Sequence, residues 1–333
     1  MQSSMQARLS PLLLSLPGLA LCAGLAAAAM WLATYAGSGV LWALVAGMAI
    51  ASFWTPSATF LPGIVLAGKN VLRLGVALLG FQISARTLHV LDGITIAALV
   101  VNVLIILAAG YLLGPLFGID RDLSLVLAAS VAICGASAAA AFALAARREP
   151  ISARDLGCTI GIVSILSLAA MILYPLFAQA LHLTPNQAGV LFGGSIHEVV
   201  HAVGAGYSVD AATGDVATVT KLLRVALLAP ALMLVVAARG GTSPSAAIAR
   251  PPLFLVGFVA FAALNIAGFV PPAIVDVATW TSRFFLPMAM CAIGLMLPWR
   301  SVLSYGWRPV VLLVVLSAIL LALMTAVVCR FPQ

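Results

Sequence analysis

Long apolar stretches follow one another along the whole chain, and only short polar segments separate them. A transmembrane helix needs about 20 mostly apolar residues, and stretches of roughly this length recur throughout the sequence. The candidate spans are residues 11–34, 39–54, 60–84, 94–117, 123–146, 156–181, 188–209, 217–238, 252–270, 276–297 and 308–329. The pattern predicts an all-α polytopic membrane protein of about 10–11 transmembrane helices, with residues 1–333 forming a single transmembrane domain.

The low charge content leads to the same conclusion. Charged residues make up 8% of the 333 and hydrophobic residues 64%, whereas a soluble domain carries about 25% charged residues. The net charge of +7 is spread thinly and forms no basic run, so we expect the lipid bilayer as a partner and no nucleic acid. Residues 11–34 resemble a secretory signal, but because further spans follow, we expect a retained first helix. The expected location is the bacterial inner (plasma) membrane, crossed several times.

The five cysteines all lie in apolar stretches, and none forms a C-x-x-C pair. They are Cys22, Cys134, Cys158, Cys291 and Cys329. We interpret them as helix-packing residues and expect neither a disulfide framework nor a cofactor.

The topology contains a contradiction. The segments "ARREPISAR" and "RGGTSPSAAIAR" are both arginine-bearing and therefore both predicted to be cytoplasmic. Three candidate spans lie between them, which would place them on opposite sides. Either 188–209 does not cross fully, or the two halves have opposite orientations, as in transporters with inverted repeats. The repeats would cover about 39–181 and 188–330, and the faint similarity of "VALLGFQIS" to "CAIGLMLPW" supports them.

Two stretches rich in Gly, Ala and Ser are unusual for simple membrane anchors. They are "SVAICGASAAAAFALAA" (130–146) and "GGSIHEVVHAVGAGYS" (193–208). Small residues can serve close helix packing. Glycine beside polar groups favours a second interpretation, a broken helix whose free backbone groups line a substrate site.

Several basic residues lie inside candidate spans. Lys69 and Arg73 are spaced i, i+4, and Lys221 and Arg224 are spaced i, i+3, so each pair shares a helix face. Arg283 lies near a span end, where snorkelling to the interface would explain it. Only one acid, Glu198, lies well inside a span. Because a charge at the bilayer centre costs at least ~2.5–3.5 kcal/mol, this excess of bases predicts a cavity that binds an anion such as sulfate, sulfite or a carboxylate.

The sequence His197-Glu198-Val199-Val200-His201 matches H-E-x-x-H, the zinc-binding pattern of metalloproteases. A third ligand is required, and Asp276 is the only plausible later candidate. The alternative role for the same residues is to hold or relay protons, because histidine titrates near neutral pH. An intramembrane zinc metalloprotease and an anion channel are the competing functions.

Four motifs in order, "GKNVLRLGVALLGFQIS", "AICGASAAAA", "GGSIHEVVHAVGAG" and "TKLLRVALLAP", resemble the YeiH family of bacterial inner-membrane proteins. Its members are commonly labelled sulfate exporters, and the family is similar to transporters with two inverted five-helix repeats. The resemblance implies a core and a gate with crossing, interrupted helices. It places Cys134, Gly135 and Ser137 at one helix break and Ser195, His197 and Glu198 in the other. In the family the position of His201 often holds another polar residue, which makes the zinc spacing incidental.

We therefore expect a secondary transporter, not an enzyme, that exports a small anion such as sulfate, sulfite or an organosulfonate. The sequence contains no Walker motif for ATP-driven pumping. Elevator carriers are often dimers, and the same analogy implies a homodimer. The expected substrate-binding residues are Lys69, Arg73, Cys134, Gly135, Ser137, Ser195, Lys221 and Arg224. The expected proton-coupling or gating residues are His197, Glu198 and His201, with no metal ligands.

Overall fold

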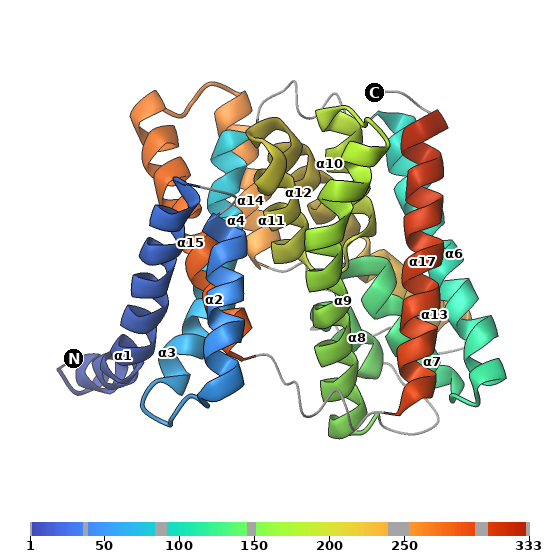
Figure 1. The fold of residues 1–333 in the computed structure, drawn as a ribbon, viewed down its shortest axis with the longest axis horizontal. Helices are drawn as coiled ribbons and strands as arrows, with labels where there is room; N and C mark the ends of the chain where they lie inside the picture. The colour runs from blue at the N-terminus through green and yellow to red at the C-terminus, as the bar shows by residue number, and fades with distance from the viewer. Residues whose placement is uncertain are drawn as a thin grey trace. The chain divides into compact units, whose positions relative to one another are not determined.

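The computed structural model describes residues 2–35, 39–83, 92–144, 151–238, 253–296 and 306–330. All regular secondary structure within these ranges is helical (Figure 1), which confirms the all-α class. The chain folds into two compact units. Unit 1 is Met1–Ser84 with Leu253–Leu297, and unit 2 is Ala85–Pro252 with Pro298–Gln333.

Unit 1 is built from long apolar helices that pack through small residues. Its elements are α1 (Gln2–Ala33), α2 (Gly39–Phe53), α3 (Leu61–Leu66), the π-helical turn η1 (Ala67–Val71), α4 (Leu72–Leu79), η2 (Gly80–Gln82), α14 (Leu253–Ile266) and α15 (Pro272–Leu295). Helix α15 packs along α2 and α4, and α14 packs against α4 and η2. Gly47 of α2 faces the backbone of α15, which allows the close approach typical of helices in lipid.

Unit 2 contains the other helices of the described residues. They are α6 (Gly93–Leu113), η3 (Gly114–Phe117), α7 (Arg121–Ala129), the π-helical turn η4 (Ser130–Cys134), α8 (Ala136–Leu144), α9 (Ala153–Ala180), α10 (Pro185–Ser195), α11 (Val199–Val209), α12 (Ala211–Ala226), α13 (Leu228–Ala238) and α17 (Trp307–Arg330). Five of these helices start at a capping side chain that accepts a backbone N–H from the first turn. The caps are Asp92, Asp120, Ser152, Thr184 and Asp210.

The predicted span 188–209 folds back on itself and does not cross unit 2. Gly189 near the start of α10 and Gly206 near the end of α11 both pack against the carbonyl oxygen of Thr213 in the first turn of α12. The two ends of this segment therefore lie at the same level, and its turn at residues 196–198 lies deep inside the unit. We call residues 185–209 hairpin 2.

The predicted span 123–146 folds back in the same way. Helices α7 and α8 pack against each other, and the chain turns at Gly135, which has a φ of 65°. We call residues 121–144 hairpin 1. Hairpin 1 enters unit 2 from the end where α9 begins, and hairpin 2 enters from the end where α9 finishes (Figure 1). The two tips meet, since the Cα of Gly135 faces the side chain of Glu198.

This re-entrant geometry resolves the contradiction in the charges. Helix α8 and helix α13 pack against each other. Helices α12 and α13 form one candidate span, Ala211–Ala238, which starts beside the end of hairpin 2, so α13 runs toward the end of unit 2 where α9 begins. Helices α8 and α13, which the arginine-bearing segments follow in the sequence, therefore end on the same side of unit 2, as the positive-inside rule requires.

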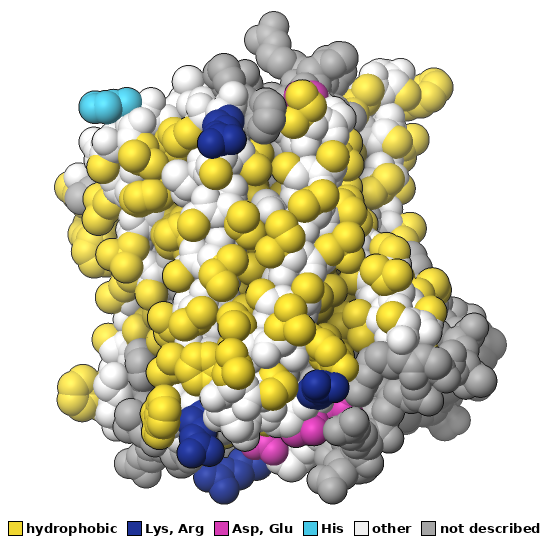
Figure 2. All heavy atoms as spheres, turned by 90° about the vertical axis from the view of Figure 1, so that its right-hand side faces the viewer, with side chains coloured by type: hydrophobic (Ala, Val, Ile, Leu, Met, Phe, Trp, Pro, Cys, Tyr) yellow, Lys and Arg dark blue, Asp and Glu magenta, His cyan; other side chains and the backbone are white. Residues whose placement is uncertain are grey.

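The outer face of unit 2 has the character of a lipid-facing surface. Figure 2 shows hydrophobic side chains across the middle of one face, with Lys, Arg, Asp and Glu near its two ends. Within the described residues, six helices are long and apolar enough to span a membrane. They are Leu14–Ala33, Leu61–Gln82, Gly93–Phe117, Arg154–Ala180, Ala211–Ala238 and Trp307–Arg330.

Candidate functional site at the tips of two helical hairpins

Two fully buried cations lie where the hairpin tips meet. Lys221 and Arg224 are 0% and 1% exposed and share one face of α12. Glycines allow α12 to come this close, because Gly193 of hairpin 2 packs directly on the backbone of Ala217 and Lys221. The sequence spacing therefore predicted the shared face, and the structure shows that this face is turned into the protein.

Backbone carbonyl groups, and no carboxylate among the described residues, bind these two cations. Lys221 Nζ donates to the carbonyl oxygens of Ile133 (2.8 Å) and Ile196 (2.6 Å). Arg224 Nε and Nη2 donate to Ala132 O at 3.1 and 2.6 Å, and Nη2 also donates to Val131 O at 2.8 Å. Its Nη1 donates to the carbonyl oxygens of Gly193 (3.2 Å) and Ile196 (3.1 Å).

The positions of these carbonyls explain the need for cations. They belong to the last turns of η4 and α10, where helix carbonyls have no partner inside the helix. The macrodipole adds about half a negative charge at each of these ends. Lys221 and Arg224 satisfy the unpaired oxygens and offset both dipoles, since each side chain contacts both hairpins.

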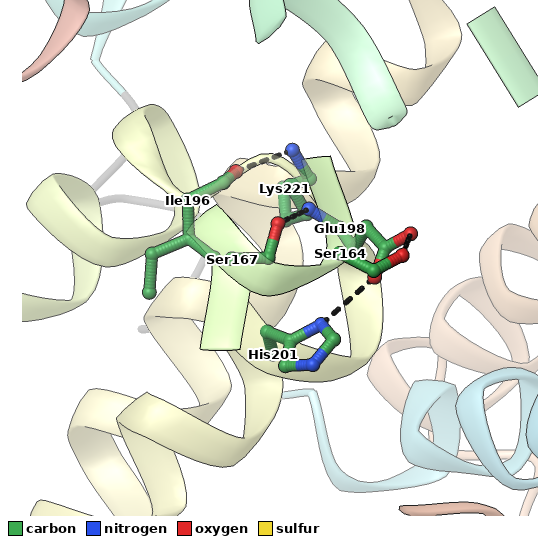
Figure 3. Close-up of polar contacts among 6 residues, drawn as sticks. All are labelled: Ser164, Ser167, Ile196, Glu198, His201 and Lys221. Carbon is green, nitrogen blue, oxygen red and sulfur yellow. Dashed lines mark hydrogen bonds and ion pairs between the residues drawn. The ribbon is translucent and has the colours of Figure 1, made fainter. Parts of the chain in front are cut away.

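Glu198 forms the polar centre of the tip of hairpin 2 (Figure 3). Its Oε1 accepts from Ser164 Oγ at 2.9 Å, and its backbone N–H donates to Ser167 Oγ at 3.2 Å. Its Oε2 lies 3.0 Å from Nδ1 of His201, whose side chain is 1% exposed. Two side chains, Ser164 and His201, therefore hold the Glu198 carboxylate, and the Glu198 side chain remains 15% exposed.

The two histidines have different surroundings. His197 Nε2 lies 3.0 Å from Ser317 Oγ of α17, whereas His201 faces Glu198. Helix α11 begins only at Val199, so His197 and His201 do not lie one turn apart on a single helix, as zinc binding by H-E-x-x-H requires. No group of three His, Cys, Asp or Glu side chains within the described part of the chain is arranged to hold a metal.

The other predicted residues of the helix breaks also gather at the tips. Cys134 and Ser195 end the first arms of hairpins 1 and 2, and both are buried. Ser195 Oγ donates to the carbonyl oxygen of Leu191. Ser137, in the first turn of α8, is exposed. Gly135 is required at its position, because its φ of 65° favours glycine and its Cα faces Glu198.

Lys69 and Arg73 belong to unit 1, and both are exposed. Lys69 lies in the π-helical turn η1, and Arg73 lies in the first turn of α4. Arg283 of α15 is also exposed. The structure thus separates the predicted basic residues into a buried pair in unit 2 and exposed residues in unit 1.

Three site residues did not emerge from the sequence: Ser164, Ser167 and Ser317. Serine is common in transmembrane helices, where it packs like a small residue, so its presence there is a weak signal. The spacing of Ser164 and Ser167, which puts them on one face of an apolar helix, was the available clue.

The fold and the site define a polytopic α-helical membrane protein with two re-entrant hairpins and a buried polar centre. The family model described as "Conserved hypothetical protein 698" matches residues 17–313. The chain belongs to this family, the UPF0324 membrane proteins, and is a multi-pass protein of the bacterial inner membrane.

The relatives cover most of the chain. The UPF0324 membrane protein TauZ of Paracoccus pantotrophus is 38% identical over 93% of this chain and 94% of its own length. The UPF0324 membrane protein RA0957 of Rhizobium meliloti is 39% identical over 84% of this chain and 81% of its own length. The UPF0324 membrane protein CT0845 of Chlorobaculum tepidum is 35% identical over 90% and 85%, respectively. No solved structure matches the chain.

Proposed function

We propose that the protein is a secondary transporter of a small anion, with the substrate site at the tips of the two hairpins. The observation that carries this proposal is the charge balance at the tips. Lys221 and Arg224 are buried within membrane depth, and the partial charges of two helix C-termini offset them only in part. The first turns of α8 and α11 add positive partial charge at the same place, and Glu198 supplies the nearby carboxylate.

The hydrogen bonds that Lys221 and Arg224 already make to carbonyl oxygens limit the N–H donors that they can offer to a substrate. All five N–H groups of Arg224 bind carbonyls, so Arg224 contributes charge but no direct hydrogen bond. Lys221 uses two of its three donors on the described carbonyls. We therefore assign direct contact to Lys221, to the exposed Ser137 hydroxyl and to backbone N–H groups in the first turn of α11. An oxyanion such as sulfate, sulfite or an organosulfonate suits this donor set.

Coupling to protons would act through Glu198 with His201, because His201 Nδ1 lies 3.0 Å from the Glu198 carboxylate, whereas His197 contacts Ser317. A proton on this pair removes negative charge beside the bound anion and so favours its binding. Export of the anion is the direction we propose. A carrier is favoured over a channel because the tips meet in the interior and leave the Lys221 and Arg224 side chains fully buried.

An inverted repeat fits the order of helices in unit 2. The series α6, hairpin 1 and α9 has a counterpart in α17, hairpin 2 and α12, running in the opposite direction. Helices α6 and α17 are antiparallel, because Gly118, which follows α6 and η3, lies beside the Arg308 side chain at the start of α17. The second series is circularly permuted, since α17 comes last in the chain. The similar segments "VALLGFQIS" and "CAIGLMLPW" close α4 and α15, which would then correspond as well.

A binding screen followed by a flux assay tests the function. Thermal unfolding of the purified protein is measured with sulfate, sulfite, thiosulfate, taurine and simple carboxylates at constant ionic strength. We expect one class of oxyanion to raise the Tm, and proteoliposomes to accumulate that anion against its gradient when a pH gradient is imposed. Flux that only dissipates gradients would indicate a channel. An unchanged response in Lys221→Met, with Arg330→Ala as the matched loss of an exposed charge, would contradict the proposed site.

A further inference from the structure

The carbonyl oxygens at the two tips form a cluster that resembles a cation site more than an ordinary helix end. Five residues contribute them: Val131, Ala132 and Ile133 from hairpin 1, and Gly193 and Ile196 from hairpin 2. In other transporters, half-helix C-termini and unwound carbonyls of this kind coordinate the sodium ion or proton that drives transport. Here every one of these oxygens accepts from the side chain of Lys221 or Arg224.

We propose that these carbonyls form a monovalent-cation site that the Lys221 ammonium and Arg224 guanidinium groups fill permanently, so that hairpins 1 and 2 join without an external cation. The contacts support a permanent occupant. Both side chains extend from α12, whose first half packs tightly against both arms of hairpin 2. Both side chains are covalently attached to α12 and at most 1% exposed, so we expect no dissolved ion to displace them from the carbonyl oxygens.

The same contacts give the two side chains a connecting role. Ile133 O and Ile196 O belong to different hairpins and share the Lys221 ammonium group. Arg224 likewise joins Val131 O and Ala132 O to Gly193 O and Ile196 O. Without a cation at this point, two sets of helix-end carbonyls would face each other with like partial charges. The inference goes beyond the proposed transport, because it concerns how the tips are held in the absence of any anion.

The wild-type protein provides the first test. Its Tm is measured without substrate in NaCl, KCl and N-methyl-D-glucamine chloride at equal ionic strength. Since the cation site is already filled, we expect the same Tm in all three salts. A saturable increase in Tm with sodium or potassium would overturn the proposal, whatever the behaviour of the variants.

Chemical rescue provides the second test. Lys221→Ala removes the ammonium group and leaves Ile133 O exposed to an empty space, so its Tm should fall by about 5 °C or more. Ammonium or methylammonium chloride should restore part of this loss, whereas choline chloride, which has no N–H donor, should not. Arg330→Ala removes an exposed charge and should keep the wild-type Tm in every salt. A loss of Tm that no small ammonium ion reduces would contradict a cation site.

A second variant, Lys221→Met, keeps the side-chain volume and tests the proposal even if Lys221→Ala does not fold. Lys221→Met should lower the Tm and should not respond to ammonium ions, because its chain fills the space. A wild-type Tm in Lys221→Met would overturn the proposal.

Cys134, the last residue of η4 and only 7% exposed, reports directly on separation of the tips. With the other four cysteines replaced by alanine, Lys221→Met should increase maleimide labelling of Cys134 several-fold. Unchanged labelling would show that Lys221 does not join the hairpins. None of these measurements includes an anion, so their outcome is independent of whether the proposed transport is found.

Discussion

At the level of single residues, the chemistry of Arg224 decides how its charge can be used. A guanidinium group has five N–H donors in a fixed plane and keeps its charge in proteins. All five donors are bound to carbonyl oxygens of the hairpin tips. The residue therefore holds the site together and contributes its charge to it, while direct substrate contacts fall to neighbouring groups. The sequence places this charge at membrane depth, but it cannot show that backbone atoms far along the chain are its partners.

Glu198 is the residue whose substitution should alter the pH dependence. Its carboxylate lies beside the proposed anion site and contacts Ser164 and His201. In the proposed coupling, a proton bound at Glu198 removes a negative charge beside the anion, so proton binding and anion binding favour each other. Glu198→Gln should bind the anion with high affinity at all pH values, and its uptake should no longer respond to a pH gradient. Binding is measured by the anion-induced shift in Tm between pH 5 and pH 8.

The matched comparison for Glu198 uses the two histidines. His201→Gln should weaken the pH dependence because His201 faces the carboxylate, whereas His197→Gln should retain it because His197 contacts Ser317. If His197→Gln removed the pH dependence and His201→Gln did not, the pairing proposed from the geometry would be wrong.

Gly135 should be intolerant of even the smallest side chain. An added Cβ would lie 2.7 Å from Cγ of Glu198, and the φ of 65° would strain any other residue. The backbone strain alone costs about 1–2 kcal/mol, so Gly135→Ala should lower the Tm and weaken anion binding. Gly157→Ala is the control, because Gly157 is exposed on α9 and no atom lies within 4 Å of its added Cβ, and it should leave the Tm unchanged or raise it slightly. Equal effects of the two substitutions would contradict the proposed contact of the tips.

At the level of elements, the sequence predicts the helices far better than it predicts their direction. Every candidate span contains helix, because length and hydropathy suffice to identify membrane helices. The broken segments at 130–146 and 193–208 were also predicted from their glycines and polar residues. Whether a broken helix continues or turns back depends on how it packs against helices that are distant in the sequence. In hairpin 2, for example, Gly189 and Gly206 both pack against α12. Local sequence does not encode such contacts, so only the conflict between the arginine-bearing segments indicated a re-entrant hairpin.

Labelling of single cysteines tests the two hairpins. Exposed positions at the two ends of hairpin 2, His182 and Ala211, should react from the same side of the membrane. Arg121 and Ser152, which flank hairpin 1, should both react from the opposite side. The measurement uses a membrane-impermeant maleimide on cells and on inverted vesicles, in a background without native cysteines. Labelling of His182 and Ala211 from different sides would show that residues 188–209 cross the membrane.

At the level of the whole molecule, the chain order and the spatial order differ. In unit 2, the last helix of the chain, α17, lies against α6 and hairpin 2, whereas a simple tandem repeat would place it after α12. A search for two consecutive similar halves would therefore detect little, and the sequence shows only one faint similarity. In the chain order, α14 and α15 of unit 1 come between two segments that belong to unit 2, so α17 is also separated in sequence from the rest of its unit.

The orientation of unit 2 follows from its charges. In the sequence, Arg147 and Arg148 follow α8, and Arg239 and Arg250 follow α13. Helices α8 and α13 themselves end at one end of unit 2, the end where α9 begins. The connections at the opposite end, 181–184 and 209–211, contain no Lys or Arg. The positive-inside rule therefore places the first end in the cytoplasm. Gln187 Nε2 donates to Val328 O at 3.0 Å, so α17 finishes at the opposite, periplasmic end.

Reporter fusions check this orientation. Alkaline phosphatase fused after Arg330 should be active, because it folds only after export, and a green fluorescent protein at the same position should be dark. Fused after Ser152, at the cytoplasmic start of α9, the two reporters should show the reverse. An active phosphatase at both positions would mean that α9 and α17 do not have the orientations that the hairpins require. In that case the inverted arrangement proposed for unit 2 would fail.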